Sequence, residues 1–206
     1  MVIKNYQLIT PLCFIALISI YAQCNKPRFD CADSKFSFEL GIKAYPDKDS
    51  INVGDTLWLE INESTTLKDG FTGQMVNYGG AANLGSAIGF IELLGNSNSR
   101  ECANDFDFTL VKGSSVNNPN VNLIREYSFD EFGSSYVFKL GVKPKKSGIY
   151  RINVSSVENV YRQSDKCTKA SFKINFKLTN QHLYYNEKNF GVIVPLPNNG
   201  YCFKVY

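Results

Sequence analysis

The sequence predicts an all-β protein folded as an antiparallel β-sandwich. Apolar and polar residues alternate with a period of two along much of the chain, and clusters of turn residues separate the alternating stretches. Stretches with the apolar spacing of an amphipathic helix are scarce. Several short strands separated by turns are typical of sandwich architectures, in which each strand buries one face and exposes the other.

In the first expected strand, residues 36–42, aromatic and aliphatic side chains occupy every second position. A turn at residues 46–49 follows, and residues 51–53 then lead through Gly54 and Asp55 into a second long strand. The same alternation predicts further strands at residues 56–62, 106–110, 136–142, 150–154, 172–178 and 201–205.

Residues 63–135 fit this pattern least well. They contain a stretch of small residues at 79–85 (GGAANLG), an apolar run at 88–94 and a polar stretch at 112–122. We interpret this part of the chain as the middle strands of the sandwich carrying enlarged loops. Long loops on a rigid scaffold are where binding residues collect, so a binding surface is expected here.

The N-terminus has the layout of a cleaved export signal. Lys4 precedes an apolar stretch at residues 8–21, which is shorter than the roughly 20 apolar residues of a membrane-spanning helix, and Ala22 supplies a small residue. The protein is therefore expected to be exported, to the cell envelope or to the medium. The expected organisation is an export signal at residues 1–23, a tether at 24–34 and a single sandwich domain at 35–206.

Cys24 follows the expected signal directly. The run IYAQC at residues 20–24 resembles the box of bacterial lipoproteins, which ends in a small residue followed by the cysteine that is acylated. Tyr21 and Gln23 depart from that pattern. Two processing routes stay open: acylation of Cys24, which would be the only contact with a membrane, or cleavage near Ala22 by the ordinary signal peptidase.

Two short stretches resemble strands of bacterial immunoglobulin-like domains. Residues 49–59 (DSINVGDTLWL) look like their opening strands, and residues 146–154 (KSGIYRINV) look like their penultimate strand. The resemblance implies an immunoglobulin-like topology, in which Gly54 forms a tight turn and Tyr150 buries its ring while its hydroxyl group bonds to backbone near the corner. The chain as a whole also resembles uncharacterised envelope proteins of Gram-negative bacteria, a likeness that carries no activity.

The immunoglobulin-like topology implies a disulfide plan. The first and last strands of such folds can pair in parallel, and the loop before the last strand would hold Cys167. Cys31 stands five residues before Phe36, just as Cys167 stands five residues before Phe172. The expected pairs are Cys31 with Cys167 and Cys102 with Cys202.

The number of cysteines connects this disulfide plan to the processing of Cys24. Of the six cysteines, Cys13 lies inside the export signal, so five follow it, an odd number in an oxidising compartment. Acylation of Cys24 would leave four to pair. A local bridge between Cys24 and Cys31 is the competing arrangement, and it would leave one thiol unpaired.

Composition argues against several functional classes. The net charge of +3 falls to +2 when Lys4 is removed with the signal, which is too little to predict a nucleic-acid partner. His182 is the only histidine, which excludes multi-histidine metal sites, and the chain has no Gly-x-Ser-x-Gly nucleophile elbow. We interpret His182 as a surface or half-buried side chain and expect neither a metal nor a cofactor.

The acidic residues leave one catalytic interpretation open. Asp105 and Asp107 would share one face of a strand, and Asp130 and Glu131 stand in a turn-like stretch. A glycoside hydrolase needs two facing carboxyl groups, so either pair could in principle serve. Solvent-facing acids are the simpler interpretation.

Tyr184, Tyr185 and Phe190 form an aromatic group near the C-terminus. Exposed aromatic rings can stack on sugars or anchor a protein partner, so these three residues are candidate ligand contacts. The alternative, which we prefer, is that they pack into the core beside the final strands.

These observations together predict a non-catalytic exported envelope protein. Its role would be that of a binding, structural or adhesion module, and its partner would be an envelope protein or a glycan. The alternative is an exported carbohydrate-active hydrolase that uses paired carboxylates.

Overall fold

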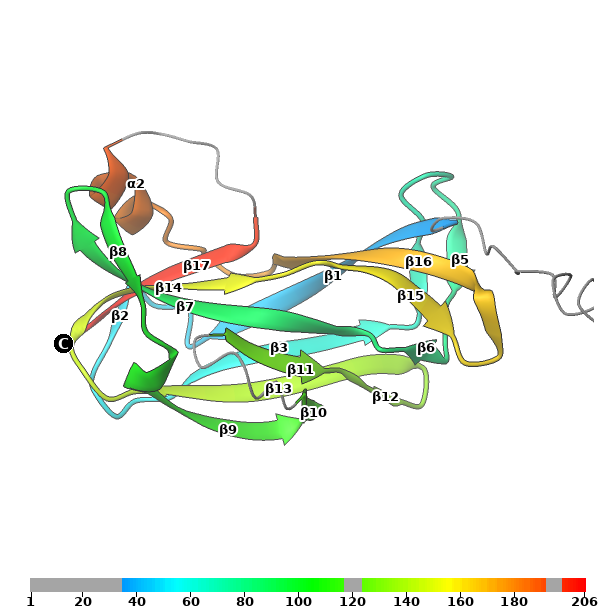
Figure 1. Ribbon diagram of the computed structural model, residues 1–206, viewed down its shortest axis with the longest axis horizontal. Helices are drawn as coiled ribbons and strands as arrows, with labels where there is room; N and C mark the ends of the chain where they lie inside the picture. The colour runs from blue at the N-terminus through cyan, green and yellow to red at the C-terminus, as the bar shows by residue number, and fades with distance from the viewer. Residues whose placement is uncertain (1–34, 117–123, 192–197) are drawn as a thin grey trace, which may run out of the picture. The chain divides into compact units, whose positions relative to one another are not determined.

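Two β-sheets pack face to face in the computed structural model, which describes residues 35–116, 124–191 and 198–206 (Figure 1). The described residues belong to one compact unit, Ala32–Tyr206. The first sheet contains, in spatial order, β12 (Asp130–Phe132), β13 (Ser135–Pro144), β3 (Leu57–Ser64), β1 (Phe36–Tyr45), β16 (Asp165–Phe176), β15 (Val157–Arg162) and β6 (Ala81–Ala82), with β9 (Phe106–Lys112) also paired to β13.

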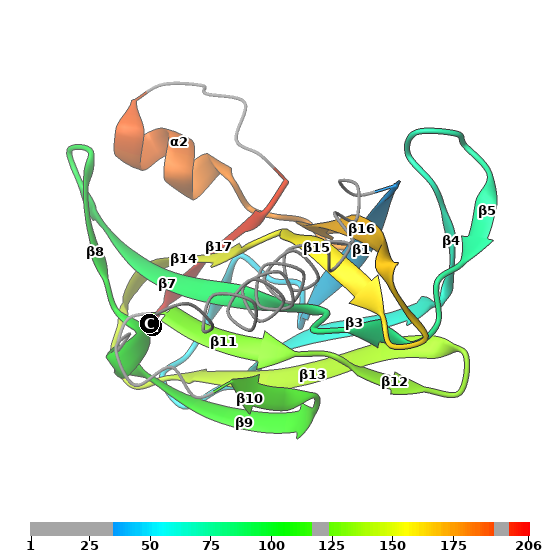
Figure 2. The same ribbon diagram turned by 45° about the vertical axis from the view of Figure 1, so that its right-hand side comes forward.

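The second sheet faces the first across the core. A separate pair, β4 (Thr66–Lys68) and β5 (Met75–Asn77), forms a hairpin arm that projects at one end of the sandwich (Figure 2). The described residues also form a 3-10 helix, η1 (Ala103–Asp105), and an α-helix, α2 (Tyr184–Phe190). The second sheet contains β10 (Ser114–Val116), β11 (Ile124–Ser128), β7 (Gly85–Gly95), β14 (Gly148–Val154), β17 (Gly200–Val205) and β2 (Ser50–Ile51), with β8 (Asn98–Glu101) paired to β7.

The all-β sandwich predicted from the alternation is confirmed, while the finer immunoglobulin-like strand order stays a prediction. Most neighbouring strands are antiparallel, but β1 runs parallel to β16 and β2 runs parallel to β17. The β1–β16 register places Phe36 beside Ala170, two residues before Phe172, which the disulfide plan had placed level with Phe36. Cys167 also lies within β16 rather than in a loop before it.

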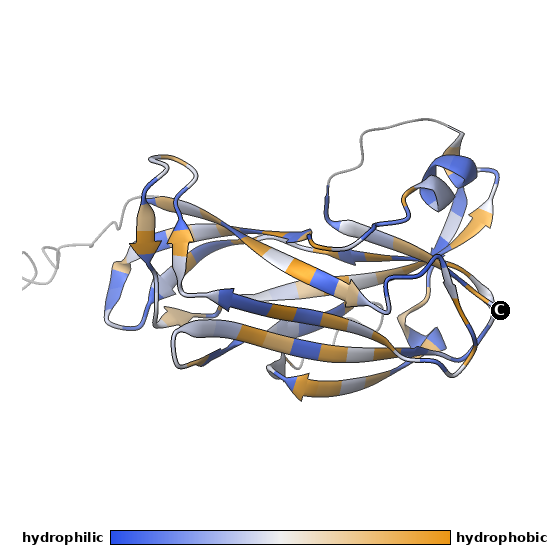
Figure 3. Ribbon diagram, turned by 180° about the vertical axis from the view of Figure 1, so that it is seen from behind, coloured by the Kyte–Doolittle hydropathy of each residue, from blue (hydrophilic) through white to orange (hydrophobic). Residues whose placement is uncertain are grey.

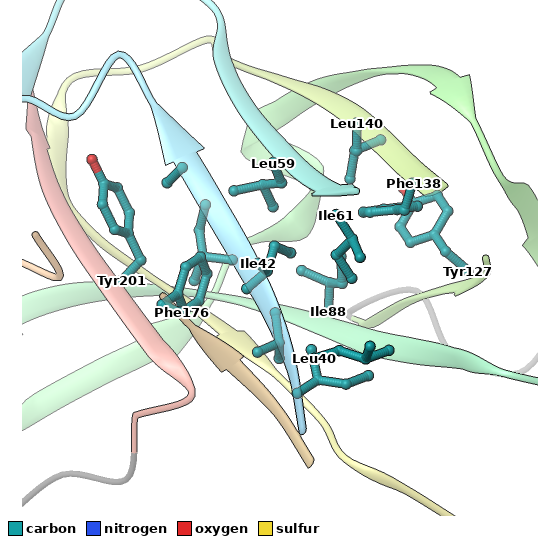
Figure 4. Close-up of a cluster of buried hydrophobic side chains, with 14 of the residues drawn as sticks. Leu40, Ile42, Leu59, Ile61, Ile88, Tyr127, Phe138, Leu140, Phe176 and Tyr201 are labelled. Carbon is teal, nitrogen blue, oxygen red and sulfur yellow. The ribbon is translucent and has the colours of Figure 1, made fainter. Parts of the chain in front are cut away.

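Period-two alternation fills the core as expected. In β1, Phe38, Leu40 and Ile42 are buried, while Glu39 and Lys43 on the other face are exposed. The bands of hydrophobic and hydrophilic residues along the strands in Figure 3 repeat this pattern. Figure 4 shows the side chains from both sheets meeting in one cluster, whose labelled members are Leu40, Ile42, Leu59, Ile61, Ile88, Tyr127, Phe138, Leu140, Phe176 and Tyr201.

The segment expected to hold the middle strands with enlarged loops contains two long strands, β7 and β9, and several short ones. Within residues 63–135, the additions to the sandwich are the β4–β5 arm and the β7–β8 hairpin. Asp69 holds the arm against β1, because its carboxylate accepts hydrogen bonds from the backbone N–H groups of Ser37 (2.9 Å) and Thr72 (3.0 Å). Backbone pairing and one buried carboxylate therefore give this region order that its polar sequence did not indicate.

The Tyr150 corner inferred from the sequence is confirmed. The ring is buried, and the hydroxyl group donates to the carbonyl oxygen of Lys146 at 3.1 Å. Burial raises the pKa of the Tyr150 phenol to about 12. Gly148 makes room for the ring, since a Cβ atom there would lie 3.0 Å from the Tyr150 hydroxyl oxygen.

Replacing Tyr150 with phenylalanine should lower the free energy of unfolding by about 1 kcal/mol, because the part-buried hydrogen bond to the carbonyl oxygen of Lys146 is lost while the packing of the ring is kept. The measurement is urea unfolding followed by circular dichroism. Tyr206→Phe is the control, because that side chain is 63 % exposed and its change should have no measurable effect. Equal stability of the two variants would contradict a stabilising corner hydrogen bond.

Candidate functional site

An open cavity of about 920 Å³ lies at the end of the sandwich that also carries the β4–β5 arm. Its lining comes from four parts of the chain: the segment around β6, the end of β9, the β12–β13 hairpin and the turn between β15 and β16. The volume lies within the roughly 300–1,000 Å³ that is typical of small-molecule sites.

The floor of the cavity is apolar and fixed by the core. Leu84, Tyr136 and Val137 are buried there, with Phe129 partly buried beside them. Tyr136 donates its hydroxyl hydrogen to the carbonyl oxygen of Tyr78. A floor tied to buried backbone in this way is preformed.

Two adjacent carboxylates stand on the rim, and backbone groups orient both. The side chain of Asp130 accepts a hydrogen bond from the N–H group of Gly113 at 2.8 Å, and Glu131 accepts one from the N–H group of Gly80 at 2.7 Å. In each case, no partner for the second carboxylate oxygen is found among the described residues. Among the lining residues within the described part of the chain, Lys112 supplies the one ammonium group.

Phe132 lies beside these acids at the tip of β12, and its side chain is 80 % exposed. Gln163 also lines the cavity, and its backbone N–H group donates to the carbonyl oxygen of Gly80. The cavity therefore combines an apolar floor, an exposed aromatic ring and hydrogen-bonding groups that are accessible from solvent.

The sequence indicated parts of this site without joining them. It singled out Asp130 and Glu131 as acids, residues 79–85 as an unusual small-residue stretch, and the middle of the chain as the place for a binding surface. It gave no reason to select Phe132 or Gln163. The sequence feature that could have identified Phe132 is the position of an apolar residue within a turn-like acidic stretch.

Asp105 and Asp107 do not share a strand face, contrary to the prediction. Asp105 ends η1 and is buried, whereas Asp107 lies in β9 with its side chain 64 % exposed. Asp105 bridges two cations, with Lys146 Nζ at 2.7 Å and Arg100 Nη2 at 2.6 Å from its oxygens. The hydrogen bond from Lys146, together with Arg100, outweighs burial and holds the Asp105 pKa below its ordinary value of 3.8.

This pKa predicts an acid-dependent contribution to stability. Because the Asp105 pKa is lower in the folded chain, its stabilising effect is complete above the unfolded-state pKa and is lost as the pH falls through the folded-state value. Asp105→Asn should be less stable than the wild type at pH ~7, and the difference should shrink below about pH 4. Urea midpoints at both pH values measure this. Asp107→Asn, an exposed acid paired only with Lys145 at 3.5 Å, should change little. A pH-independent deficit in Asp105→Asn would refute the linkage.

His182 is buried, not surface or half-buried as expected. It lies between two acids of the β1–β2 turn: Nε2 is 3.1 Å from Asp47 Oδ1, and Nδ1 is 2.5 Å from Asp49 Oδ1, the latter outside hydrogen-bond geometry. Its ring also packs edge-on against Tyr201 at 5.6 Å. The histidine therefore ties the segment before α2 to the β1–β2 turn.

The three candidate contact aromatics lie on α2, which packs against β7 and the last strand, β17. Tyr184 is 46 % exposed and its ring lies 4.1 Å from that of Tyr185, while Tyr185 and Phe190 are partly buried. The preferred interpretation as core residues is thus wrong for Tyr184. None of the three lines the cavity, so the structure does not bring them to the site described above.

Cys102 and Cys202 are both free and buried, so the expected bridge between them is wrong. Cys202 pairs with Arg151 in β14, Arg151 with Ile91 in β7, and Ile91 with Glu101 in β8. Three strand spacings of about 4.8 Å therefore separate the two cysteines, well beyond disulfide range. Burial raises the pKa of both thiols to about 12, which makes them poor nucleophiles.

Cys167 is disulfide-bonded. Its expected partner Cys31, the acylation candidate Cys24, the export signal and the tether all lie outside the described residues. The pairing of Cys31 with Cys167 and the processing of Cys24 therefore stay predictions.

The fold and the site define a β-sandwich with an open cavity of mixed polar and apolar character. Comparison with protein families, curated proteins and solved structures gave no match. Within residues 35–116, 124–191 and 198–206, no cluster of three or more potential metal ligands is present. In the same ranges, no helix has the length and apolar character needed to cross a membrane.

Proposed function

We propose that the protein is a non-catalytic binding module of the cell envelope and that the cavity at the β6–β12–β13 end is its ligand site. The observation that most supports this proposal is the exposed ring of Phe132, which lies beside a preformed apolar floor and oriented polar groups. Concave sites lined by apolar and aromatic side chains with a few placed polar groups are the usual form of ligand pockets.

The arrangement of the acids supports binding over hydrolysis. A glycoside hydrolase needs a general acid with a raised pKa facing a second carboxylate. The pKa of Asp105 is instead lowered and Asp105 does not line the cavity, while Asp130 and Glu131 are neighbours on one short strand and each is held by a backbone N–H group. No observation favours the hydrolase alternative.

The envelope location in this proposal rests on the N-terminal sequence. Mass spectrometry of the N-terminus of the protein purified from cells would test it. A diacylated or triacylated Cys24 is the result expected for a lipid-tethered module, and an unmodified start at Gln23 or Cys24 would show a secreted or periplasmic one. Retention of residues 1–23 would contradict export with cleavage.

The binding role can be tested with cavity variants of the full chain, captured on a biosensor through a C-terminal tag. Phe132→Ser removes the exposed ring, and Gln163→Trp fills the cavity from an exposed turn position. Phe71→Ser is the matched control, since that ring is 68 % exposed on the β4–β5 arm. Detergent-solubilised envelope extract should bind the wild type and the control but bind both cavity variants less. Equal responses from all four proteins would overturn the proposed function.

A further inference from the structure

We propose that the ligand of this cavity is a neutral saccharide, a short segment of a polymeric or lipid-linked glycan. The inference rests on the proposed function, because it specifies the chemistry of the same site. It follows from the charge of the rim, the hydrogen-bonding capacity of its side chains and the accessibility of one aromatic ring.

The rim disfavours anions. Among the residues that the structure describes, its charged groups are two carboxylates, Asp130 and Glu131, and one ammonium group, Lys112. Backbone N–H groups hold both carboxylates in place, and no ion pair to either is found in the described ranges, so their charge is not cancelled by a contacting cation. A phosphate, sulfate or sialyl group entering the cavity would meet two carboxylates against one ammonium group, which is an excess of negative charge.

The same rim suits hydroxyl groups. Each carboxylate uses one oxygen for a backbone donor, the second has no partner among the described residues, and a carboxylate accepts hydrogen bonds from hydroxyl donors strongly. Lys112 and the amide group of Gln163 add donors and a further acceptor. Backbone anchoring reduces the ordering cost that flexible acidic side chains would otherwise pay on binding.

The exposed ring of Phe132 supplies the apolar contact that a sugar needs. A pyranose has one face of C–H groups, and the electron-rich face of an aromatic ring attracts such weakly positive hydrogens. At 80 % exposure, Phe132 contributes almost nothing to the core, so its ring can be covered by a ligand without disturbing the fold. An extended peptide is the other ligand of mixed character, and it serves as a separate arm of the test.

The test uses the same captured proteins with defined probes: neutral oligomers of glucose, mannose and N-acetylglucosamine, sulfated and sialylated oligosaccharides, and a mixed peptide library. At least one neutral oligomer should bind the wild type. Phe132→Ser should raise its Kd about tenfold, while Phe132→Trp, which keeps an aromatic face, should stay within about twofold and Phe71→Ser should be unchanged.

Three outcomes would overturn the inference: preference for acidic glycans, binding of peptides without binding of glycans, or neutral-glycan binding that Phe132→Ser leaves intact. If the response to envelope extract depends on Phe132 but no neutral oligomer binds, the saccharide inference fails and the binding role stands. If neither response depends on the cavity variants, the proposed function fails as well.

Discussion

Replacing Phe172 with alanine should lower the free energy of unfolding by about 3–5 kcal/mol, the cost of truncating a large buried aromatic side chain. The side chain is fully buried in β16, and its ring centroid lies 5.3 Å from that of Phe38, 5.7 Å from Tyr78 and 6.1 Å from Tyr136. These neighbours come from separate parts of the chain; the Phe38 and Tyr78 rings contact each other, and the Tyr136 hydroxyl group donates to the backbone carbonyl oxygen of Tyr78. The walls of the new cavity therefore cannot collapse to fill it.

Phe132→Ala is the matched control, because it removes the same atoms from a ring that is 80 % exposed, and its effect should stay within about 0.5 kcal/mol. Phe172→Leu should fall between the two, since it keeps most of the buried volume. Urea unfolding monitored by far-ultraviolet circular dichroism measures all three variants. A Phe172→Ala protein as stable as Phe132→Ala would show that the aromatic cluster does not support the fold.

The long alternating strands could be predicted from sequence, because a strand that buries one face has an apolar residue at every second position. Residues 36–42 show this: the side chains expected to be buried at Phe38, Leu40 and Ile42 are buried. Tyr150 could be predicted for a related reason, since its corner hydrogen bond reaches only four residues back to Lys146. Structural features that depend on residues close together in the sequence could therefore be predicted.

Structural features that depend on residues far apart in the sequence could not be predicted. The short strands β4, β5 and β6 have two or three residues each, too few for a period to appear, and their order depends on pairing with other strands. The disulfide plan failed for Cys102 and Cys202 because it assumed that cysteines left over from one pair must meet. The sheet instead sets two strands between them.

The candidate site shows the same limit. Gly80, Lys112, Asp130 and Gln163 converge although more than 80 positions separate the first from the last. The sequence could identify Asp130 and Glu131 as candidate acids. It could not show that the backbone N–H groups of Gly113 and Gly80 would orient them. A binding site assembled from loops of several hairpins leaves no local signature in the chain.

Gly85 is the position where the close approach of two strands allows no side chain. It opens β7 opposite Ser128 of β11, and a Cβ atom there would lie 2.1 Å from the carbonyl oxygen of Tyr127. That oxygen belongs to backbone, so it cannot rotate away as a side chain would. Gly85→Ala should therefore destabilise the protein by about 3 kcal/mol, the upper end of the usual cost of overpacking.

Gly89 provides a control in the same strand. It also pairs with β11, opposite Ile124, yet a Cβ atom there would meet nothing within 4 Å. Gly89→Ala should be neutral or should stabilise the protein by about 0.4–1 kcal/mol, because alanine reduces the freedom of the unfolded chain. The two substitutions thus differ in their effect on stability, because only Gly85→Ala should destabilise the protein, and thermal or urea unfolding of both measures this difference. Similar losses from both would mean that glycine is needed in β7 for flexibility rather than for the approach of β11.

The Gly85 substitution also bears on the cavity, because Leu84 on its floor accepts a hydrogen bond from the N–H group of Phe129 at 2.8 Å. Pushing β11 away from Gly85 would displace both residues. Gly85→Ala should then weaken ligand binding even at temperatures where the protein is fully folded, whereas Gly89→Ala should bind as the wild type does. If the folded Gly85→Ala protein bound normally, the preformed floor would not contribute to recognition, and the rim alone would account for it.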